Sequence, residues 1–365
     1  MHVIRVRNVM QALPAGVAYL VEHGKRAPSR AGEVLVAPGP VTTAYTHPRE
    51  RVLSSTVRDA NPFFHLMEAL WVLAGRQDAA FLDNYIRDYS QRFAESGGHI
   101  HDAYGFRLRH SLGFDQLDYA VDVLRSDSSS RQCVLQIWDA FVQDDLSQRE
   151  WKTRPCNTHI YLRVRQEVEA IGYSLVHGMG GAHQELGSFL DITVCCRSND
   201  IVWGAYGANV VQFSVLQEYL AARIGVGVGT YYQVSNNYHA YVSELERLRQ
   251  RAGGCSLEEL PSVLTDEQYF TYQHNLVDDP GTFDREFTTL MINLDQLHSG
   301  VEDLDDLEWH ADAKNRFLTE TAWPAASAMR LHRLGYTELA VDMARKMEDP
   351  AWRTACVTWL LGRKR

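Results

Sequence analysis

The stretch LDITVCC (residues 190–196) decides the class of the fold, together with RSNDIVWGAYGAN (197–209) and VVQFSVLQEYLAARI (210–224) that follow it. Apolar and β-branched residues in the first stretch predict a strand. The second contains turn-forming residues, and the third has the length and apolar content of a helix. A further strand is predicted at 226–235. A strand, a turn, a helix and another strand in this order indicate a sheet with helices packed against it.

The rest of the chain extends this pattern in both directions. Strands are predicted at 132–139 and 158–168, and a helix at 62–77, where apolar residues cover most of the circumference. Residues 315–362 show a helical pattern. Breaks in that pattern are expected at Pro324, Gly335 and Pro350. We therefore predict an α+β protein.

Composition excludes several classes of protein. Of 365 residues, 45% are hydrophobic and 22% charged, which is typical of a soluble globular protein. We expect neither a membrane-spanning helix nor a secretory signal, so a cytoplasmic location is predicted. The formal charge of -10 argues against a protein that coats DNA. The six cysteines show no spacing of a zinc site, and we expect no bound metal.

One cysteine has neighbours that suit a nucleophile. Cys156 follows Pro155 at the beginning of a predicted strand, with Lys152 and Arg154 close in sequence. Nearby cations stabilise a thiolate, which is the nucleophilic form of cysteine. Taken alone, the pattern also fits an inert cysteine buried at a strand end.

Two further patterns suggest a binding site. Arg197, Ser198 and Asp200 follow a strand, and an arginine fork with a serine hydroxyl can hold a phosphate. A surface ion pair is the alternative. Glu68 lies inside the apolar helix 62–77, where a carboxylate must be hydrogen-bonded or protonated. Such a residue serves either as a structural hydrogen-bond hub or as an acid or base.

The order of these motifs along residues 20–245 resembles the thymidylate synthase family, which includes the pyrimidine-nucleotide hydroxymethylases. The matching segments are Arg30-Ala31-Gly32, Glu68-Ala69-Leu70-Trp71-Val72-Leu73, Tyr104-Gly105, Pro155-Cys156, Arg197-Ser198-Asn199-Asp200 with Gly204, and Gly229 to Tyr241. The resemblance implies a thymidylate synthase-like mixed sheet packed with helices. It also implies a homodimer with active sites shared across the interface, and 5,10-methylenetetrahydrofolate as the one-carbon donor.

The resemblance also implies a role for each matching residue. Cys156 would attack C6 of a pyrimidine nucleoside monophosphate, Glu68 would relay protons near N3 and the C4 substituent, and Tyr104 would assist removal of the C5 proton. The substrate-binding residues would be Arg30, Arg197, Ser198, Asn209, His239 and Tyr241, with Arg131 reaching the phosphate site of the other subunit. The cofactor-binding residues would be Asp200, Gly204 and Ser90.

Several positions depart from the family pattern. Asn157 stands where a thymidylate synthase has histidine, Asn209 lies one residue late, and Gln132 replaces the second arginine of a pair. Ser90 replaces a tryptophan that packs on the cofactor, and a small residue there would admit water to the reactive carbon. We therefore predict 5-hydroxymethylation, and the changes at Asn157 and Asn209 favour a cytidine nucleotide, CMP or dCMP.

Two regions lie outside the family pattern. An insertion is expected near 167–188 of a catalytic domain that spans residues 1–310, and residues 311–365 are expected to form a helical C-terminal extension. Other functions stay open: reductive methylation of dUMP, hydroxymethylation of dUMP, and a non-catalytic relative that binds a nucleotide or RNA. A cysteine hydrolase would pair Cys156 with His159 or His239, but no hydrolase motif accompanies them.

Overall fold

A mixed sheet forms the centre of the protein. The computed structural model describes residues 1–140, 150–166, 187–265, 275–299 and 313–363, so most of the expected insertion lies outside the described residues. The strands are β1 (His2–Val6), β2 (Lys25–Ser29), β3 (Gly32–Val36), β4 (Val41–Tyr45), β5 (Val134–Gln136), β6 (Asn157–Gln166), β7 (Ser188–Asp200) and β8 (Gly227–Tyr241). Their order is β1-β4-β8-β7-β6-β5, and the hairpin β2–β3 joins β8 through β3.

The pair β7–β8 is parallel, as is β1–β4, and the other pairs are antiparallel. This mixed sheet, with helices packed on it, confirms the predicted α+β class. Strand β8 is longer than predicted, because the segment beyond residue 235 pairs with the end of β7 and with β3. Ser198 lies opposite Asn237, and Asp200 opposite His239.

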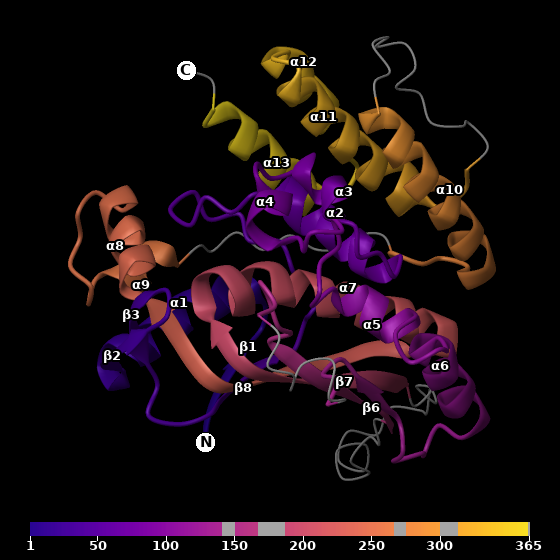
Figure 1. Cartoon of the computed structure of the whole chain (residues 1–365), viewed down its shortest axis with the longest axis horizontal. Helices are drawn as coiled ribbons and strands as arrows, with labels where there is room; N and C mark the ends of the chain where they lie inside the picture. The colour runs from indigo at the N-terminus through magenta and orange to yellow at the C-terminus, as the bar shows by residue number, and fades with distance from the viewer. Residues whose placement is uncertain (141–149, 167–186, 266–274, 300–312, 364–365) are drawn as a thin grey trace, which may run out of the picture.

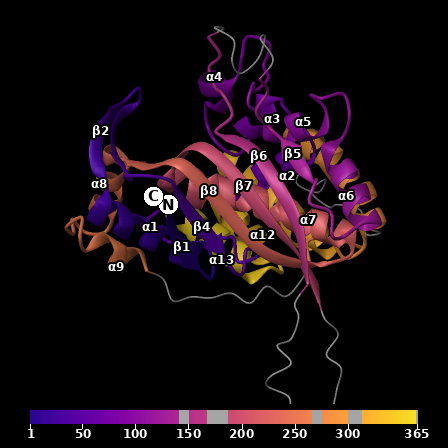
Figure 2. The same ribbon diagram turned by 90° about the horizontal axis from the view of Figure 1, so that it is seen from below.

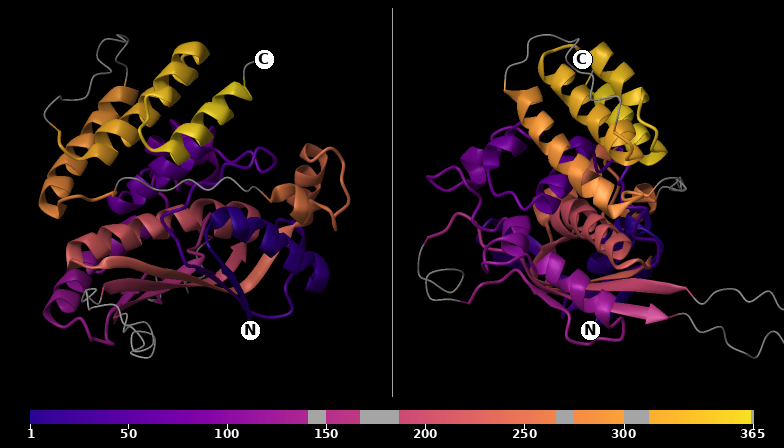
Figure 3. Two further views of the ribbon diagram at one scale, coloured as in Figure 1. Left: turned by 180° about the vertical axis from the view of Figure 1, so that it is seen from behind. Right: turned by 90° about the vertical axis from the view of Figure 1, so that its right-hand side faces the viewer.

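The helices form two layers above the sheet (Figures 1 and 3). The helical elements up to residue 126 are α1 (Val9–His23), α2 (Pro62–Leu73), α3 (Ala79–Asp83), α4 (Tyr89–Phe93), α5 (Tyr104–Arg109) and α6 (Gln116–Ser126). Those from residue 201 to 264 are the π-helix η1 (Ile201–Ala208), α7 (Asn209–Ile224), α8 (Val242–Arg251) and α9 (Leu260–Leu264). The upper layer contains α10 (Pro280–His298), η3 (Leu318–Ala322), α11 (Trp323–Arg333), α12 (Thr337–Arg345) and α13 (Pro350–Leu361).

Helix α2 connects the two layers. It packs against α7 below and against α11 and α13 above, and all twelve of its residues are buried. Asn61 caps its first turn by accepting a hydrogen bond from the Phe64 amide. Burial on several sides explains the apolar circumference of the sequence, and it encloses the one acidic residue of the helix, Glu68, in the protein interior.

The other face of the sheet points away from the two helical layers (Figure 2). Seen from below, strands β6, β7 and β8 lie in front of the helices (Figure 2). Tyr161 on this sheet is 46% exposed although it is a large aromatic residue. Among the described helices, none is long and apolar enough to cross a membrane.

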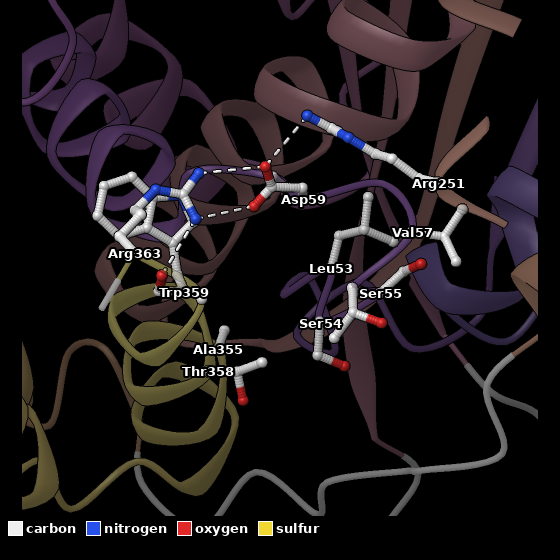
Figure 4. Close-up of a pocket in the computed structure, with 13 residues that line it drawn as sticks. Leu53, Ser54, Ser55, Val57, Asp59, Arg251, Ala355, Thr358, Trp359 and Arg363 are labelled. Carbon is white, nitrogen blue, oxygen red and sulfur yellow. Dashed lines mark hydrogen bonds and ion pairs between the residues drawn. The ribbon is translucent and has the colours of Figure 1, made fainter. Parts of the chain in front are cut away.

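The last helix is tied to the loop after β4 through Asp59. Arg363 donates from both terminal guanidinium nitrogens to the Asp59 carboxylate at 3.0 and 3.1 Å, and Arg251 of α8 approaches the same carboxylate at 3.2 Å (Figure 4). The Arg363 guanidinium also lies over the Trp359 ring, 3.6 Å from its centre. Together with residues 53–57 and Ala60, these groups line a cavity of about 370 Å³.

A buried ion pair joins both helical layers. Glu218 of α7 contacts Arg51, and both side chains are at least 96% buried. The other carboxylate oxygen accepts a hydrogen bond from the Leu276 amide at 2.9 Å, in the segment that leads to α10. Removing one partner of a buried pair leaves the other charge without compensation, which costs far more than the pair contributes as a whole.

We expect Glu218→Ala to lower the free energy of unfolding by roughly 3–5 kcal/mol, because Arg51 loses the carboxylate that it contacts and the Leu276 amide loses its acceptor. Urea denaturation measures the change. The matched control is Asp342→Asn in the exposed pair Arg345–Asp342, where both side chains are at least 60% exposed, and a change within about 0.5 kcal/mol is expected. Equal effects of the two substitutions would contradict the prediction.

Candidate active site

A cavity of about 680 Å³ opens at the ends of β7 and β8. The hairpin β2–β3, helix α4, the turn before α5 and the loop before β6 complete its walls. Eight residues that the sequence placed in the site line it or lie close to it, and Glu68 among them is described below. Arg30, Cys156, Arg197, Ser198, His239 and Tyr241 line the cavity, and Tyr104 lies close enough to Cys156 for the two to interact electrostatically.

Cys156 is half-buried and lies directly before β6. Burial raises the pKa of its thiol, while the positive charge of Arg197 lowers it and the negative charge of Asp102 raises it further. The Arg197 side chain donates hydrogen bonds to the carbonyl oxygens of Pro155 at 2.9 Å and Arg154 at 3.0 Å. Arg197 therefore both fixes the loop that carries the cysteine and favours its thiolate form.

Cations gather at the mouth of the cavity. Arg30 lies in the turn between β2 and β3, where Ser29 Oγ donates to the carbonyl of Gly32 at 2.5 Å and Gly32 takes the left-handed φ of +122°. Lys152 and Arg154 line the same cavity. An anion such as a phosphate would be attracted here, and the arginine forks suit its geometry.

The end of β8 carries two hydrogen-bonding groups. His239 Nδ1 lies 2.8 Å from Asn237 Oδ1, and the His239 and Tyr241 rings meet edge to face with their centres 5.5 Å apart. Residues 239 and 241 are two apart on a strand, so their side chains share a face. This face lines the cavity.

Glu68 lies in the buried floor of the site. Burial raises the pKa of its carboxyl from the usual 4.5 to about 7, against hydrogen bonding to Gln212 and Tyr89, which lowers it, and with the Asp102 charge adding to the rise. A carboxyl with this pKa exchanges a proton near neutral pH, as an acid or base requires. Tyr104, the first residue of α5, stacks on Phe213 with ring centres 5.9 Å apart.

Several buried polar atoms lack a hydrogen-bond partner within the described part of the chain. Such atoms occur in several parts of the protein, and five of them belong to predicted site residues or their neighbours: Glu68 Oε2, Asn157 Nδ2, Asn157 Oδ1, Asp200 Oδ1 and Gln212 Oε1. Native proteins satisfy nearly all buried polar groups, so a cluster of exceptions indicates where a polar ligand binds. Both donors and acceptors are present, which suits the edge of a heterocyclic base.

The predicted residue Asn209 does not line the cavity. It is buried, and its Nδ2 donates to Asn199 Oδ1 at 3.3 Å. The π-helix η1 directly precedes it, and a π turn accommodates one extra residue within a helix. This accounts for the position of Asn209 one residue late in the sequence. Gly204 lies in the same turn, where an added Cβ would meet Asn199 Oδ1 at 2.7 Å.

The predicted residues Asp200, Ser90 and Arg131 also lie outside the cavity walls. Ser90 of α4 turns away: its hydroxyl and its amide both donate to the Asp83 carboxylate, the amide at 3.0 Å. The neighbouring Tyr89 faces Glu68 instead, and Phe93 lines the cavity. Arg131 is exposed beside β5, and its predicted reach into another subunit stays a prediction.

Sequence reasoning missed other residues of the cavity. Asp102, Trp151, Thr153 and Asn237 line it. Asp102 stands two residues before Tyr104 and Asn237 two before His239, so proximity to a matching motif was the available signal. Trp151 and Thr153 come from a loop without any periodic pattern.

Comparison with known proteins gives a consistent assignment. The thymidylate synthase family model matches residues 15–274. A deoxyuridylate hydroxymethyltransferase of Pseudomonas phage M6 is 44% identical over 248 residues, 68% of this chain and 64% of that protein. A protein of the same name from Bacillus phage SP01 is 33% identical, over 56% of this chain and 50% of its own length. A putative thymidylate synthase of Methanosarcina mazei is 25% identical, over 66% of this chain and 89% of its own length.

The matches therefore span about half to two thirds of the length of these phage relatives. The family model, in contrast, covers well over half of this chain and includes every cavity residue named above. The chain belongs to the thymidylate synthase family.

Proposed function

We propose that the protein transfers a one-carbon unit from 5,10-methylenetetrahydrofolate to C5 of dUMP and releases the 5-hydroxymethyl nucleotide. The observation that carries the proposal is the single cavity that brings Cys156 together with the cations Arg30 and Arg197 and with His239 and Tyr241. A nucleoside monophosphate presents a phosphate, a sugar hydroxyl and an electrophilic ring carbon, and each has a suitable partner here.

Cys156 would act as the nucleophile. Its sulfur adds to C6 of the pyrimidine, and the electron pair of the C5–C6 double bond moves toward C5 and the C4 oxygen. Glu68 Oε2 has no hydrogen-bond partner in the part of the chain that the structure describes, and protonated Glu68 would donate to the developing charge beside N3 and the C4 substituent. Tyr104, near Cys156 and Asn157, would assist removal of the C5 proton.

Asp200 at the end of β7 and Trp203 in η1 would bind the pterin of the one-carbon donor. One oxygen of Asp200 accepts from the Trp203 amide at 2.7 Å, while Oδ1 is buried without a partner within the described residues. An unpaired carboxylate oxygen suits a ring N–H. The Trp203 side chain is 48% exposed and offers an aromatic surface nearby. Bound there, methylenetetrahydrofolate would supply the carbon that joins C5.

The base is proposed to be uracil, because two relatives that are 44% and 33% identical carry the name deoxyuridylate hydroxymethyltransferase. A cytidine nucleotide, CMP or dCMP, is the second candidate. Asn157 supports it, because Nδ2 and Oδ1 are both buried and have no hydrogen-bond partner among the described residues. An amide in this state can donate to the O4 of uracil or accept from the amino group of cytosine.

We also propose the quaternary and domain organisation that the resemblance implies. The sheet face visible in Figure 2 would be the homodimer interface, and Arg131, three residues before the edge strand β5, would reach the other subunit. Residues 1–310 would form the catalytic domain and residues 311–365 a helical extension.

The direct test mixes the protein with methylenetetrahydrofolate and dUMP, dCMP, UMP or CMP, and weighs the nucleotide product by mass spectrometry. A gain of CH2O with dUMP is expected. A gain of CH2 would instead mean methylation, and a gain with a cytidine nucleotide alone would support the second candidate. Absence of product with all four would refute the enzyme and leave a nucleotide-binding relative.

Cys156→Ser is expected to reduce product formation at least about 10³-fold, because the hydroxyl is a far weaker nucleophile at C6 than the thiolate. Cys255→Ser is the matched control, since Cys255 is also half-buried but does not line the cavity. Its rate should equal that of the unaltered protein. Full activity of Cys156→Ser would rule out the covalent mechanism.

Glu68→Gln should lower the rate and at the same time change how stability depends on pH. Folding raises the pKa of Glu68 from 4.5 to about 7. As the pH rises, the unfolded chain therefore loses this proton before the folded protein does. The free energy of unfolding declines over this range until the pH passes the pKa of Glu68 in the folded protein. Between pH 5 and 8 the variant should therefore gain roughly 2–3 kcal/mol relative to the unaltered protein. Urea unfolding at both pH values measures this, and a difference that does not change with pH would contradict it.

A further inference from the structure

Asp102 is a carboxylate that the proposed steps leave without a task. It lies in the turn directly before α5, and it is the one carboxylate among the described residues that line the cavity. Thr153 Oγ1 donates to its Oδ1 at 2.6 Å, from the loop that leads to Cys156. The turn is held by stacking of His101 on Trp151, with ring centres 4.0 Å apart and planes 8° from parallel.

The position of this carboxylate works against the nucleophile. Its charge raises the pKa of Cys156 and of Glu68, and burial raises the pKa of Asp102 itself. A cavity that binds an anionic nucleotide and needs a thiolate gains nothing from a further negative charge unless that charge has a separate use. Desolvated carboxylates beside a nucleophile are the groups that take and return protons.

We propose that Asp102 is the general base that activates the water required for hydroxymethylation, an inference that rests on the proposed function. The water must reach the carbon attached to C5 while C6 is still bound to Cys156. Asp102 lines the same cavity as the Cys156 sulfur and is anchored to the loop that carries it. Glu68 does not line the cavity, and His239 is among the residues proposed to bind the substrate.

The step balances as follows. Once the carrier has left, the ring bears an exocyclic C5=CH2 group conjugated with the C4 carbonyl. Water adds to the CH2 carbon, its proton passes to the Asp102 carboxylate, and the electron pair of C5=CH2 moves to the C4 oxygen. The C4 carbonyl then re-forms, the C5–C6 double bond returns, and the Cys156 thiolate leaves C6. The product is the 5-hydroxymethyl nucleotide.

Several groups set the charge on Asp102. Thr153, the Asp102 backbone, Arg107 and His101 lower its pKa, and its charge is felt by Cys156, Tyr104, Glu68 and Tyr89. The hydroxyl of Thr153 is the one that can be removed with little change of shape, by substitution with valine. Without this hydroxyl the pKa of Asp102 rises. As the pH falls, a reaction that needs the ionised carboxylate therefore begins to lose rate at a higher pH than in the unaltered protein.

The test compares Asp102→Asn with the unaltered protein in the presence of azide, an anionic nucleophile that needs no base. Asn keeps the shape and the Thr153 contact but cannot take a proton. We expect the hydroxymethyl product to fall about 10²-fold or more, while azide capture to the 5-azidomethyl nucleotide continues at the original rate. Unchanged hydroxymethylation, or a parallel loss of both products, would overturn the assignment.

A second variant keeps the inference testable should Asp102→Asn fold poorly. Thr153→Val should move the acidic limb of the rate–pH profile to higher pH and change the rate on the plateau by no more than about twofold. A purely structural role for Thr153 would instead lower the rate on the plateau and leave the acidic limb at the same pH. A methyl product from the unaltered protein would overturn both this inference and the proposed hydroxymethylation. A defect confined to the variants bears on Asp102 alone.

Discussion

The parallel pairing of β7 with β8 is the constraint on which the site depends. Its register sets Ser198 beside Asn237 and Asp200 beside His239, so two segments about forty residues apart in sequence contribute to one wall. Side chains alternate between the faces of a strand, and a slip by one residue would turn Ser198, or Asn237 and His239, away from the cavity that they line. The helix α7, buried between the sheet and α2, fixes the pairing from above.

The electrostatic effects on the pKa values of the site residues act in opposite directions. Burial and the negative charge of Asp102 raise the pKa of the Cys156 thiol, whereas the positive charge of Arg197 lowers it. Glu68 is kept partly protonated by the same burial that makes α2 a good connector between layers. Sites of this kind trade folding stability for reactivity, because groups placed for chemistry are seldom placed where they are most stable. The well-compensated pair Arg51–Glu218 shows the contrasting, structural use of buried charge.

Much of this arrangement could be predicted from the sequence. Strands and helices with clear periodicity were found, and motifs at strand ends, such as Cys156 and Arg197, indeed meet in one cavity because strand ends converge at a sheet edge. Asp102 and Thr153 could not be found in this way, since they meet through a turn and a loop that share no pattern in sequence. The orientation of Ser90 toward Asp83 depends on the local path of α4, which composition does not specify.

The π-helix η1 has a consequence for how this chain is compared with its relatives. One added residue in a helix rotates everything before it, relative to everything after it, by about 100°. A π turn can take up that rotation within Ile201–Ala208, so Asp200 at the end of β7 and the body of α7 can keep their relative orientation when one residue is added between them. Relative to the family pattern, the numbering that fits at Asp200 is therefore one residue out at Asn209.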